Sequence, residues 1–576
     1  MAAAPYESYR RQDITTSAEK GTSMKKILSF LLCASMLGCC VLSGCGESSS
    51  DSGSSKSAES SKSEEKTEDP VKGGKAIAYT DKYRNVYQIF TQSFCDSNGD
   101  GIGDFKGIIS ELDYINDGDP NGGDDLGADA LWMTPINPSE SYHKYSVEDY
   151  YNVDKSFGTL DDFDELVTEC HKRGINVIMD LVLNHISYKN PLFLEACEEV
   201  EKGNLDGKAK YFEFHEKGYY SEDVNTIKVG DYICEANFSP TMPEWNLTSS
   251  ETKEEFKKIA EFWLDRGVDG FRLDAVKYFE NKHTNGEEFL EWFVDTCRGI
   301  KSDVYLVGED WEDDSKIKDY YASGIDSLFA FRFAQSFGEI VEAINTSGGQ
   351  TLAKKFTSYD SKMSKVNPDY INAVFLSNHD QARIANALES KGLAAEKFAA
   401  NVYMLVPGNS YTYYGEEIGM TAPNTESDKY FRLPMIFDSD NLPDITVDGA
   451  STVEAPKYGG VKQQLADSDS LLNHYRRIIN VKLQNPEIAR GRITSQQVFN
   501  DPAIGAYYIE KDGTKLLVIH NFSSDKEKTL EITNDMIPNA KVCADFLASA
   551  NDAHLAIKDG KITLPAYSSV VIRPAA

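Results

Sequence analysis

Short apolar runs alternate with polar loops and longer amphipathic segments over most of the chain. Eight runs are rich in Val, Ile, Leu, Phe, Tyr and Trp, and each is too short to form a typical helix. The runs are residues 85–90, 128–134, 176–183, 269–273, 304–307, 327–333, 373–376 and 411–414. Apolar strands that alternate with helices are typical of a parallel sheet covered on both faces. The pattern therefore predicts an α/β fold.

Two of the intervening segments carry signals for the start and end of a helix. Thr159 with Asp162, and Thr248 with Glu251, have the spacing of a capping box. Each pair precedes apolar residues at helical spacing and then a glycine that ends the helix. The two apolar stripes are Phe163, Leu166, Val167 and Cys170, and Phe256, Ile259, Ala260, Trp263 and Leu264. Eight strand–helix units predict a (β/α)8 TIM barrel, whose active site lies at the carboxyl ends of the strands.

The regular alternation is broken in two places. Residues 186–246, after the third strand, are too many for an ordinary connection, so we expect a small inserted domain there. After residue 490, period-two segments such as 515–520 and 562–564 replace the helical pattern. We therefore predict a barrel from residues 75–185 and 247–485, and a C-terminal antiparallel β-sandwich domain from residues 486–576.

The N-terminal part has the features of an exported lipoprotein. Residues 24–44 combine Lys25 and Lys26 with an apolar run and small residues, as in a signal peptide. The sequence LSGC at 42–45 resembles the lipobox of bacterial lipoproteins, in which Cys45 is acylated. Residues 1–23 are interpreted as an upstream extension, and the Ser-rich residues 45–74 as a flexible tether. We expect a lipid-anchored protein on the extracellular face of the cell membrane.

Net charge and cysteine spacing narrow the possible partners. The formal charge of −33 disfavours nucleic acid and anionic membrane surfaces, so we expect membrane contact only through the lipid anchor. A neutral ligand such as a sugar is compatible with this charge. The six cysteines beyond the signal peptide form no CxxC pair, which favours buried free thiols over a thiolate metal site. We expect a monomer.

Acidic residues lie at the ends of several predicted strands. Asp180 lies in the third strand, and Asp274, Glu309 and Asp380 follow the fourth, fifth and seventh. One acid at a strand end is commonly structural, but several should meet at one mouth of a barrel. Neighbouring carboxylates can then differ in protonation, as glycosidic bond cleavage requires. The spacing alone leaves acid–base chemistry on other substrates open.

Six segments resemble the signature regions of glycoside hydrolase family 13, the α-amylase family. They are DLVLNH (180–185), GFRLDAV (270–276), VGED (307–310), SNHD (377–380), MPEWN (242–246) and YYGEEIGM (413–420). The resemblance covers about residues 80–576. MPEWN is similar to the MPDLN of the intermediate type of α-amylase, although Glu244 and Trp245 depart from that pattern.

The resemblance implies a retaining double-displacement mechanism with three catalytic acids. Asp274 would be the nucleophile, and Glu309 the general acid and then the general base. Asp380 would hold the sugar hydroxyls and favour the cation-like transition state.

The same resemblance implies a set of substrate-binding residues. Tyr145 would be an aromatic platform, His185 and His379 would bond the sugar, and Arg272 would hold Asp274 ionised. Asp180 would orient Arg272, Lys277 would contact the leaving-group side, and Arg383 would hold a chain end.

The segment DSNGDGIGD at 96–104 starts like a calcium loop of EF-hand type, but Gly107 replaces the final bidentate Glu. Many family members carry a similar calcium-binding loop after the first barrel strand. The resemblance implies a structural Ca²⁺ ion held by Asp96, Asn98, Asp100, the backbone oxygen of Ile102, and Asp104. A metal-free Asx turn is the alternative.

We expect an α-amylase that hydrolyses α-1,4-glucosidic bonds of starch or maltodextrin, which are the expected partners. An exo-acting α-glucosidase, a neopullulanase-like enzyme and a glucanotransferase are alternatives within the same family. A catalytically inactive glucan-binding lipoprotein is a further alternative, although all three catalytic acids are present.

Overall fold

In the computed structural model, the described residues are 83–119, 123–220, 224–452, 454–496, 499–551 and 553–575. All of them belong to the compact unit Thr67–Ala576. The predicted extension, signal peptide, tether and lipidated Cys45 lie outside the described residues. Among the helices of the described part, none is both long enough and apolar enough to cross a membrane.

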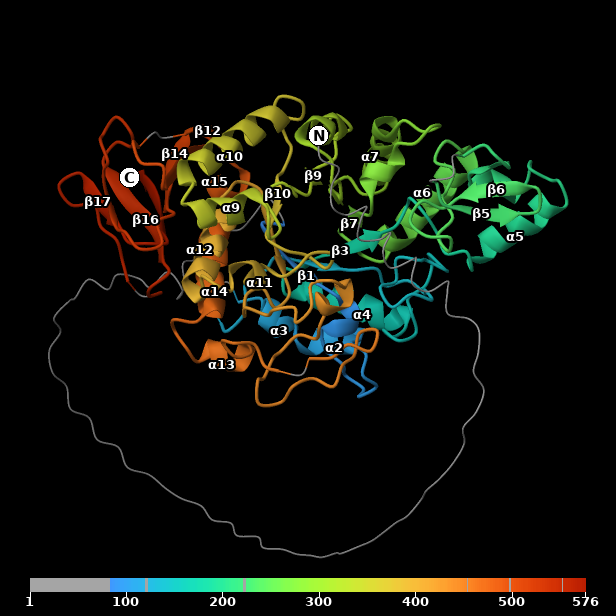
Figure 1. Cartoon of the computed structure of the whole chain (residues 1–576), viewed down its shortest axis with the longest axis horizontal. Helices are drawn as coiled ribbons and strands as arrows, with labels where there is room; N and C mark the ends of the chain where they lie inside the picture. The colour runs from blue at the N-terminus through green and yellow to red at the C-terminus, as the bar shows by residue number, and fades with distance from the viewer. Residues whose placement is uncertain are drawn as a thin grey trace, which may run out of the picture. The chain divides into compact units, whose positions relative to one another are not determined.

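Eight parallel strands form the predicted barrel (Figure 1). They are β1 (Asn85–Ile89), β2 (Ala130–Met133), β3 (Asn176–Leu181), β7 (Gly270–Leu273), β8 (Tyr305–Gly308), β9 (Ser327–Leu328), β10 (Ala373–Phe375) and β11 (Asn409–Tyr413). Their order is β10-β11-β1-β2-β3-β7-β8-β9. The ring closes between β9 and β10, because Phe329 forms a parallel bridge with Ala373 and the Ala330 N–H donates to the Ala373 carbonyl at 2.9 Å.

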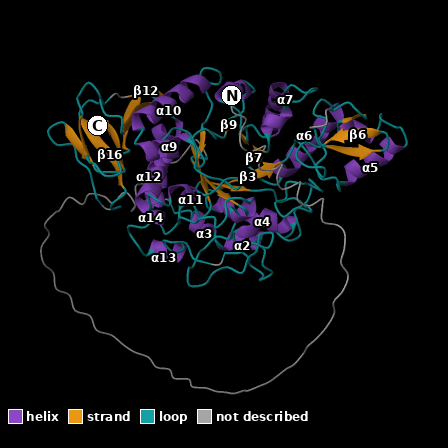
Figure 2. Cartoon of the chain, viewed as in Figure 1, coloured by secondary structure: helices purple, strands orange, loops and turns teal. Residues whose placement is uncertain are grey.

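Helices occupy the connections between the barrel strands, as the sequence predicts (Figure 2). They are α2 (Phe105–Ser110), α3 (Leu112–Ile115), α4 (Leu160–Lys172), α6 (Ser250–Asp265), α7 (Gly286–Ile300), α8 (Asp314–Tyr321), α9 (Glu339–Thr346), α10 (Gly349–Met363), α11 (Ile384–Leu388) and α12 (Leu393–Met404). Three more helices follow the last barrel strand, namely α13 (Val461–Leu465), α14 (Leu471–Gln484) and α15 (Pro486–Arg490). Short 3₁₀ helices are η1 (Thr91–Ser93), η3 (Val276–Phe279) and η4 (Asp428–Tyr430).

One predicted helix start is confirmed and the other is wrong by one residue. The capping box of Thr159 and Asp162 opens α4. In α6 the N-cap is Ser249, whose side chain accepts from the Thr252 N–H, and Thr248 instead bonds Asn246. Three consecutive hydroxyl residues at 248–250 can all cap a helix, so the spacing alone did not select the right one.

The barrel interior is filled by large side chains rather than left open. Trp132, Phe329 and Tyr411 pack together there, and all three are buried. The hydroxyl groups of Tyr305 and Tyr411 lie 2.8 Å apart, so these buried polar groups are hydrogen bonded. Such packing makes the ends of the strands rigid supports for loop residues.

The sixth predicted strand, 327–333, is shorter than expected. Only Ser327 and Leu328 form β9, and the backbone then turns, because the Phe333 N–H donates to the Ala330 carbonyl. The Phe329 and Phe331 rings still point into the barrel core. Their apolar character, which suggested a longer strand, therefore comes from core packing.

The long connection after β3 contains its own small sheet. It holds α5 (Pro191–Glu201), η2 (Lys208–Tyr211), β4 (Phe214–Glu216), β5 (Thr226–Val229) and β6 (Tyr232–Glu235). The three strands are antiparallel in the order β4-β6-β5. A bridge from His185 to Glu244, and the Trp245 N–H that donates to the Asn184 carbonyl at 3.2 Å, tie this segment to the loop after β3.

Antiparallel strands form the C-terminal part, as the sequence predicts. One sheet has the order β12-β13-β14-β18-β16, and a second pairs β15 with β17. Their bounds are β12 (Arg492–Gln496), β13 (Ile504–Lys511), β14 (Thr514–Asn521), β15 (Lys528–Glu531), β16 (Ala540–Leu547), β17 (Lys561–Leu564) and β18 (Ser568–Pro574). Apolar residues of both sheets share one core. A Cβ atom on Gly349 of α10 would lie 2.6 Å from the Gly505 nitrogen, so helix and sheet approach closely.

The six cysteines of the described residues are all free, as predicted. Cys170, Cys234 and Cys297 are buried, whereas the other three are only half-buried.

Candidate active site

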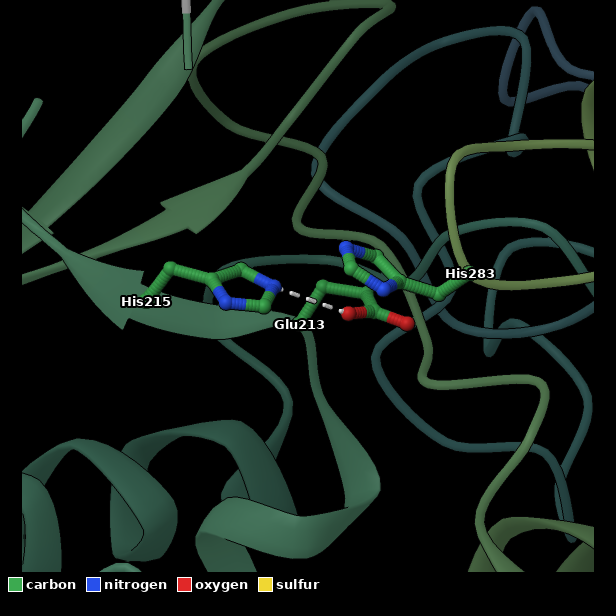
Figure 3. A group of neighbouring side chains, drawn as sticks. All are labelled: Glu213, His215 and His283. Atoms are coloured by element: carbon green, nitrogen blue, oxygen red, sulfur yellow. Dashed lines mark hydrogen bonds and ion pairs between the residues drawn. The ribbon is translucent and has the colours of Figure 1, made fainter. Parts of the chain in front are cut away.

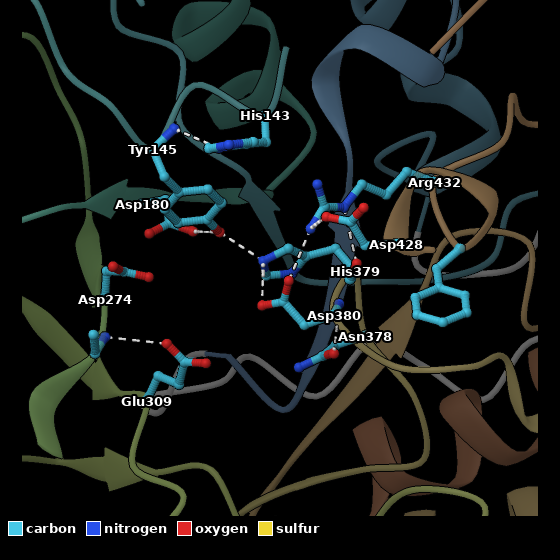
Figure 4. A network of polar contacts seen from close by, with 12 residues as sticks. His143, Tyr145, Asp180, Asp274, Glu309, Asn378, His379, Asp380, Asp428 and Arg432 are labelled. Carbon is cyan, nitrogen blue, oxygen red and sulfur yellow. Dashed lines mark hydrogen bonds and ion pairs between the residues drawn. The ribbon is translucent and has the colours of Figure 1, made fainter. Parts of the chain in front are cut away.

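Arg272 lies at the centre of a buried group of acids at the carboxyl ends of β3, β7 and β8. Figure 4 shows three of these acids, Asp180, Asp274 and Glu309, across the site from His379 and Asp380. The register of β3 and β7 places Asp180 directly beside Arg272. Arg272 Nη1 lies 2.7 Å from Asp180 Oδ1 and 2.7 Å from Asp274 Oδ1, while its Nη2 lies 2.8 Å from Glu309 Oε2. Residues 272 and 274 share a face of the extended chain because strand side chains alternate. One guanidinium therefore holds three of the predicted acids.

Backbone hydrogen bonds continue past the strand ends and fix the positions of the nucleophile and acid candidates. The Asp274 N–H donates to the Leu181 carbonyl at 3.2 Å, and the Glu309 N–H to the Leu273 carbonyl at 2.9 Å. Ala275 then adopts a left-handed conformation with φ 52°, which is unfavourable for a residue with a Cβ atom. This turn lets the Ala275 N–H donate to Glu309 Oε2 at 3.1 Å.

The environment of Glu309 favours its protonated form. Burial is the main cause that raises the pKa of Glu309, and Asp274 and Asp380 add to it, while Arg272 opposes them. Its other oxygen, Oε1, accepts from the Trp311 indole at 2.7 Å. A carboxyl group with a raised pKa next to a second acid is the arrangement of a general acid.

Asp380 lies in the opposite environment. Its backbone N–H donates to the side chain of Asn378, which fixes the turn after β10. Burial would raise the pKa of Asp380, but His379, Arg432 and Arg272 together outweigh burial and hold it well below its usual range. At a pH at which Glu309 is protonated, Asp380 is therefore still ionised.

His379 connects the Asp380 side of the site to the Arg272 side. Its Nδ1 faces the Gln88 amide nitrogen at 2.8 Å, so Nδ1 accepts and the proton lies on Nε2. Nε2 lies 2.6 Å from the Tyr145 hydroxyl and 3.1 Å from Asp380 Oδ2. Burial is the main cause that lowers the pKa of His379, in agreement with a neutral imidazole.

Tyr145 lies beside His379 in the same network. Its ring stacks on His379 with centroids 5.6 Å apart and planes 8° apart. Its hydroxyl donates to Asp180 Oδ2 at 3.0 Å. Asp180 is itself 1% exposed, so it orients Arg272 and Tyr145 and has no surface left for a substrate.

Arg432 is a part of the site that the sequence analysis missed. Its Nη2 lies 2.8 Å from Asp380 Oδ1 and 2.9 Å from Asp428 Oδ2, and its Nη1 donates to the Tyr142 hydroxyl at 2.8 Å. Its Nε donates to the His379 carbonyl at 2.9 Å. Arg432 follows η4 in an irregular segment, so no strand or helix pattern pointed to it.

Three other predicted substrate residues lie outside this network. The His185 ring packs on Phe238, with centroids 4.7 Å apart. Lys277 is partly exposed and pairs with Glu312 at 3.1 Å. Arg383 is 1% exposed and donates to the Tyr414 carbonyl at 2.6 Å, so the structure gives it a packing role; its substrate contact stays a prediction.

The loop 96–104 is wound around its own polar side chains. Asp96 accepts from the N–H groups of Asn98, Gly99 and Gly101, and Asp100 accepts from that of Ile102. These are hard oxygen atoms of the kind that Ca²⁺ prefers. Asp96 Oδ2 and Asp100 Oδ1 each accept one of these bonds and retain a lone pair, whereas Asp96 Oδ1 accepts two.

Asp104 is the least available of the predicted Ca²⁺ ligands. Its Oδ1 caps α2 by accepting from the Gly107 N–H, and its Oδ2 accepts from Ser97 and Asn98. Asp104 Oδ1 nevertheless accepts only one bond from the described residues, so the predicted oxygen set of Asp96, Asn98, Asp100, Ile102 and Asp104 fits a Ca²⁺ ion.

Asp274 and Glu309, held by one guanidinium at the mouth of a (β/α)8 barrel, have the arrangement of the two acids of a glycosidase. The family model for the α-amylase catalytic domain matches residues 88–491, and that for the α-amylase SusG C-terminal domain matches residues 504–571. The chain belongs to the α-amylase family.

Individual relatives agree with this assignment. Alpha-amylase 3 of Dictyoglomus thermophilum is 32% identical over 85% of this chain and 93% of its own length. An oligo-1,6-glucosidase of Bacillus sp. (strain F5) is 29% identical over 75% of this chain and 98% of its own length. The solved structure of Eubacterium rectale Amy13B superposes with a TM-score of 0.80 at 35% identity, over 87% of this chain and 97% of that one.

Proposed function

We propose that this glycosidase is a retaining α-amylase that hydrolyses α-1,4-glucosidic bonds of starch and maltodextrins. The observation that carries the proposal is the shared guanidinium of Arg272, which contacts Asp274 through Nη1 and Glu309 through Nη2. Two acids held by one planar group lie close enough to act on a single glycosidic bond.

In the first step, the Glu309 carboxyl group donates its proton to the glycosidic oxygen while Asp274 attacks the anomeric carbon. The bond from that carbon to the leaving oxygen breaks, and a glycosyl ester of Asp274 forms. In the second step, the Glu309 carboxylate takes a proton from water, and the water oxygen displaces Asp274. Two inversions give net retention of configuration.

Asp380 and its neighbours stabilise the charge that develops on the sugar ring. The ionised Asp380 favours an oxocarbenium-like transition state and accepts hydrogen bonds from sugar hydroxyls. Arg432 and His379 hold Asp380 in place. Tyr145 provides a flat apolar surface for a pyranose ring.

The choice of α-1,4 bonds rests on the α-amylases among the relatives and on the SusG-type C-terminal domain. The oligo-1,6-glucosidase relative makes α-1,6 hydrolysis the second candidate. Lys277, which is partly exposed and pairs with Glu312, supports the first candidate through its resemblance to the lysine of the leaving-group side in α-amylases.

We further propose that the loop 96–104 binds a structural Ca²⁺ ion through Asp96, Asn98, Asp100, the Ile102 carbonyl and Asp104. The oxygen donor set and the backbone turns at Asp96 support this site. The ion would brace the loop after β1 and supply no catalytic chemistry.

We propose that Cys45 carries a lipid anchor that keeps the enzyme on the extracellular face of the membrane, where long glucans are met first. The support is the sequence of residues 24–45. We also assign the enzyme to the intermediate (MPDLN-like) type, on the sequence of residues 242–246.

Chromatography of the products from amylose, pullulan and a short maltodextrin tests the proposed substrate choice. An α-amylase converts amylose to a series of maltodextrins and lowers its viscosity early. Release of glucose alone, or cleavage of α-1,6 bonds in preference to α-1,4 bonds, would assign the enzyme to the second candidate. NMR of the first product gives its anomeric configuration, and β-anomer as the initial product would contradict the retaining mechanism.

A further inference from the structure

Three potential metal ligands meet away from the catalytic acids, between the inserted segment and the loop that follows η3 (Figure 3). Glu213 immediately precedes β4, and His215 lies within β4. His283 lies between η3 and α7, nine positions after Asp274 in the chain. Residues 213 and 215 lie on one face of the strand because alternate side chains point the same way.

The ligand atoms are close enough to hold one ion. One atom from each of the three side chains lies within 4.8 Å of the other two. Glu213 Oε2 lies 3.2 Å from His215 Nε2. The two imidazole rings are nearly parallel, with centroids 5.0 Å apart and planes 22° apart. Among the described residues, this is the one group of three or more His, Cys, Asp or Glu side chains with such spacing.

Glu213 gives an independent reason to expect a cation here. Its side chain is 4% exposed, and its Oε1 has no hydrogen-bond partner within the described part of the chain. A buried carboxylate oxygen without a donor is costly, because its interaction with water has been lost. Glu235 lies near enough to add to this cost. Figure 3 shows the Glu213 carboxylate next to both imidazole rings. A cation shared by the three side chains would satisfy this carboxylate.

Neighbouring side chains support the two imidazoles. The Tyr219 hydroxyl lies 2.5 Å from His283 Nε2, and the Tyr219 ring stacks on His215 at 3.9 Å. The Lys282 ammonium lies 3.9 Å from the Tyr219 ring centroid, so its charge faces that ring. A partner on a histidine nitrogen fixes the ring orientation in many metal sites.

We propose that Glu213, His215 and His283 bind a divalent transition-metal ion, of which Zn²⁺ is the best match. Two imidazole nitrogens and one carboxylate oxygen form a donor set that suits Zn²⁺ and disfavours the hard ions Ca²⁺ and Mg²⁺. Water completes the coordination. The ion joins the inserted sheet to the loop after η3, and its role is to fix these segments together.

Calorimetric titration of the untagged full-length chain with Zn²⁺ tests the proposal. The protein is first stripped of metal and then held in excess Ca²⁺, so that any Ca²⁺ site is filled throughout. We expect one equivalent of Zn²⁺ to bind and the melting temperature to rise. In the variant His283→Ala, the affinity should fall by more than about tenfold, since even residues behind the ligands change metal affinity by that factor.

His554→Ala is the matched control, because this exposed imidazole pairs with Asp545 in the C-terminal domain. It should bind Zn²⁺ as the wild type does. Glu213→Gln retains the buried volume and should also weaken binding, and circular dichroism checks that it folds. Equal Zn²⁺ affinity in the wild type and in His215→Ala and His283→Ala would overturn the proposal, as would the absence of Zn²⁺ binding to the wild type.

Discussion

Arg272 and Asp180 form a fully buried ion pair, with Nη1 2.7 Å from Oδ1 and both side chains at most 1% exposed. Neither side chain has surface left for a sugar. The pair instead fixes the guanidinium that contacts Asp274 and Glu309. Removing either partner would leave a buried charge uncompensated.

Replacing Arg272 by Lys should lower kcat on the order of a hundredfold, because one ammonium group cannot contact two carboxylates in fixed directions. The measurement is kcat on a soluble maltodextrin, with circular dichroism to confirm folding. Arg298→Lys is the control, since the partly exposed Arg298 pairs with the half-buried Asp326 and, among the described residues, contacts none of the catalytic acids. A kcat equal to that of the wild type would show that Arg272 does not organise the acids.

Replacing Glu309 by Gln should lower kcat by roughly 10²–10⁴-fold and leave glucan binding intact. The pH dependence follows from the same residue. Burial raises the pKa of Glu309, and the acid must be protonated, so kcat/KM should fall as pH rises through this raised pKa. The basic limb of the pH profile should vanish in Glu309→Gln, and its persistence would point to another acid.

Replacing Arg432 by Met should shift the acid limb of the pH profile upward. Asp380 must be ionised, and Arg432 contributes to holding its pKa below the usual range. Without that charge, Asp380 becomes protonated at a higher pH, and activity is lost earlier as the pH falls. The free energy of unfolding should change with the same sign. Because the pKa of Asp380 is lower in the folded state than in the unfolded state, its ionisation stabilises the fold at pH values above the unfolded-state pKa, and this contribution is lost as the pH falls through the folded-state pKa. Lys429→Met, whose partner is the exposed Asp448, should leave the profile unchanged.

Removing Ca²⁺ with a chelator should lower the melting temperature by a few degrees, because an ion that binds only the folded protein stabilises it. Asp96→Ala should melt at the lower temperature with or without chelator. Asp369→Ala, an exposed loop acid, should respond as the wild type does. A melting curve that chelation leaves unchanged would mean that 96–104 is a metal-free turn.

The barrel could be predicted from the sequence because eight apolar runs alternate with helical segments, as the strands and helices of a (β/α)8 barrel do. The acids Asp274, Glu309 and Asp380 were predictable for the same reason, since each follows a strand. Strand lengths were less predictable, because Phe329 and Phe331 are apolar through core packing and not through strand pairing.

Arg432 and the group of Glu213, His215 and His283 depend on long-range contacts. Arg432 reaches Asp380 from an irregular segment 52 positions later in the chain. His283 meets His215 only because the inserted segment folds against the loop after η3. No periodicity or short spacing encodes such contacts, so they required the three-dimensional structure.

The most direct test of the proposed mechanism is to trap the covalent intermediate. A slow glycosyl fluoride substrate, incubated with the enzyme and followed by peptide mass spectrometry, should place one glycosyl group on Asp274. The variant Asp274→Asn should carry no label and should be inactive. A glycosyl group on another residue, or hydrolysis that persists in Asp274→Asn, would contradict the assignment of Asp274 as nucleophile.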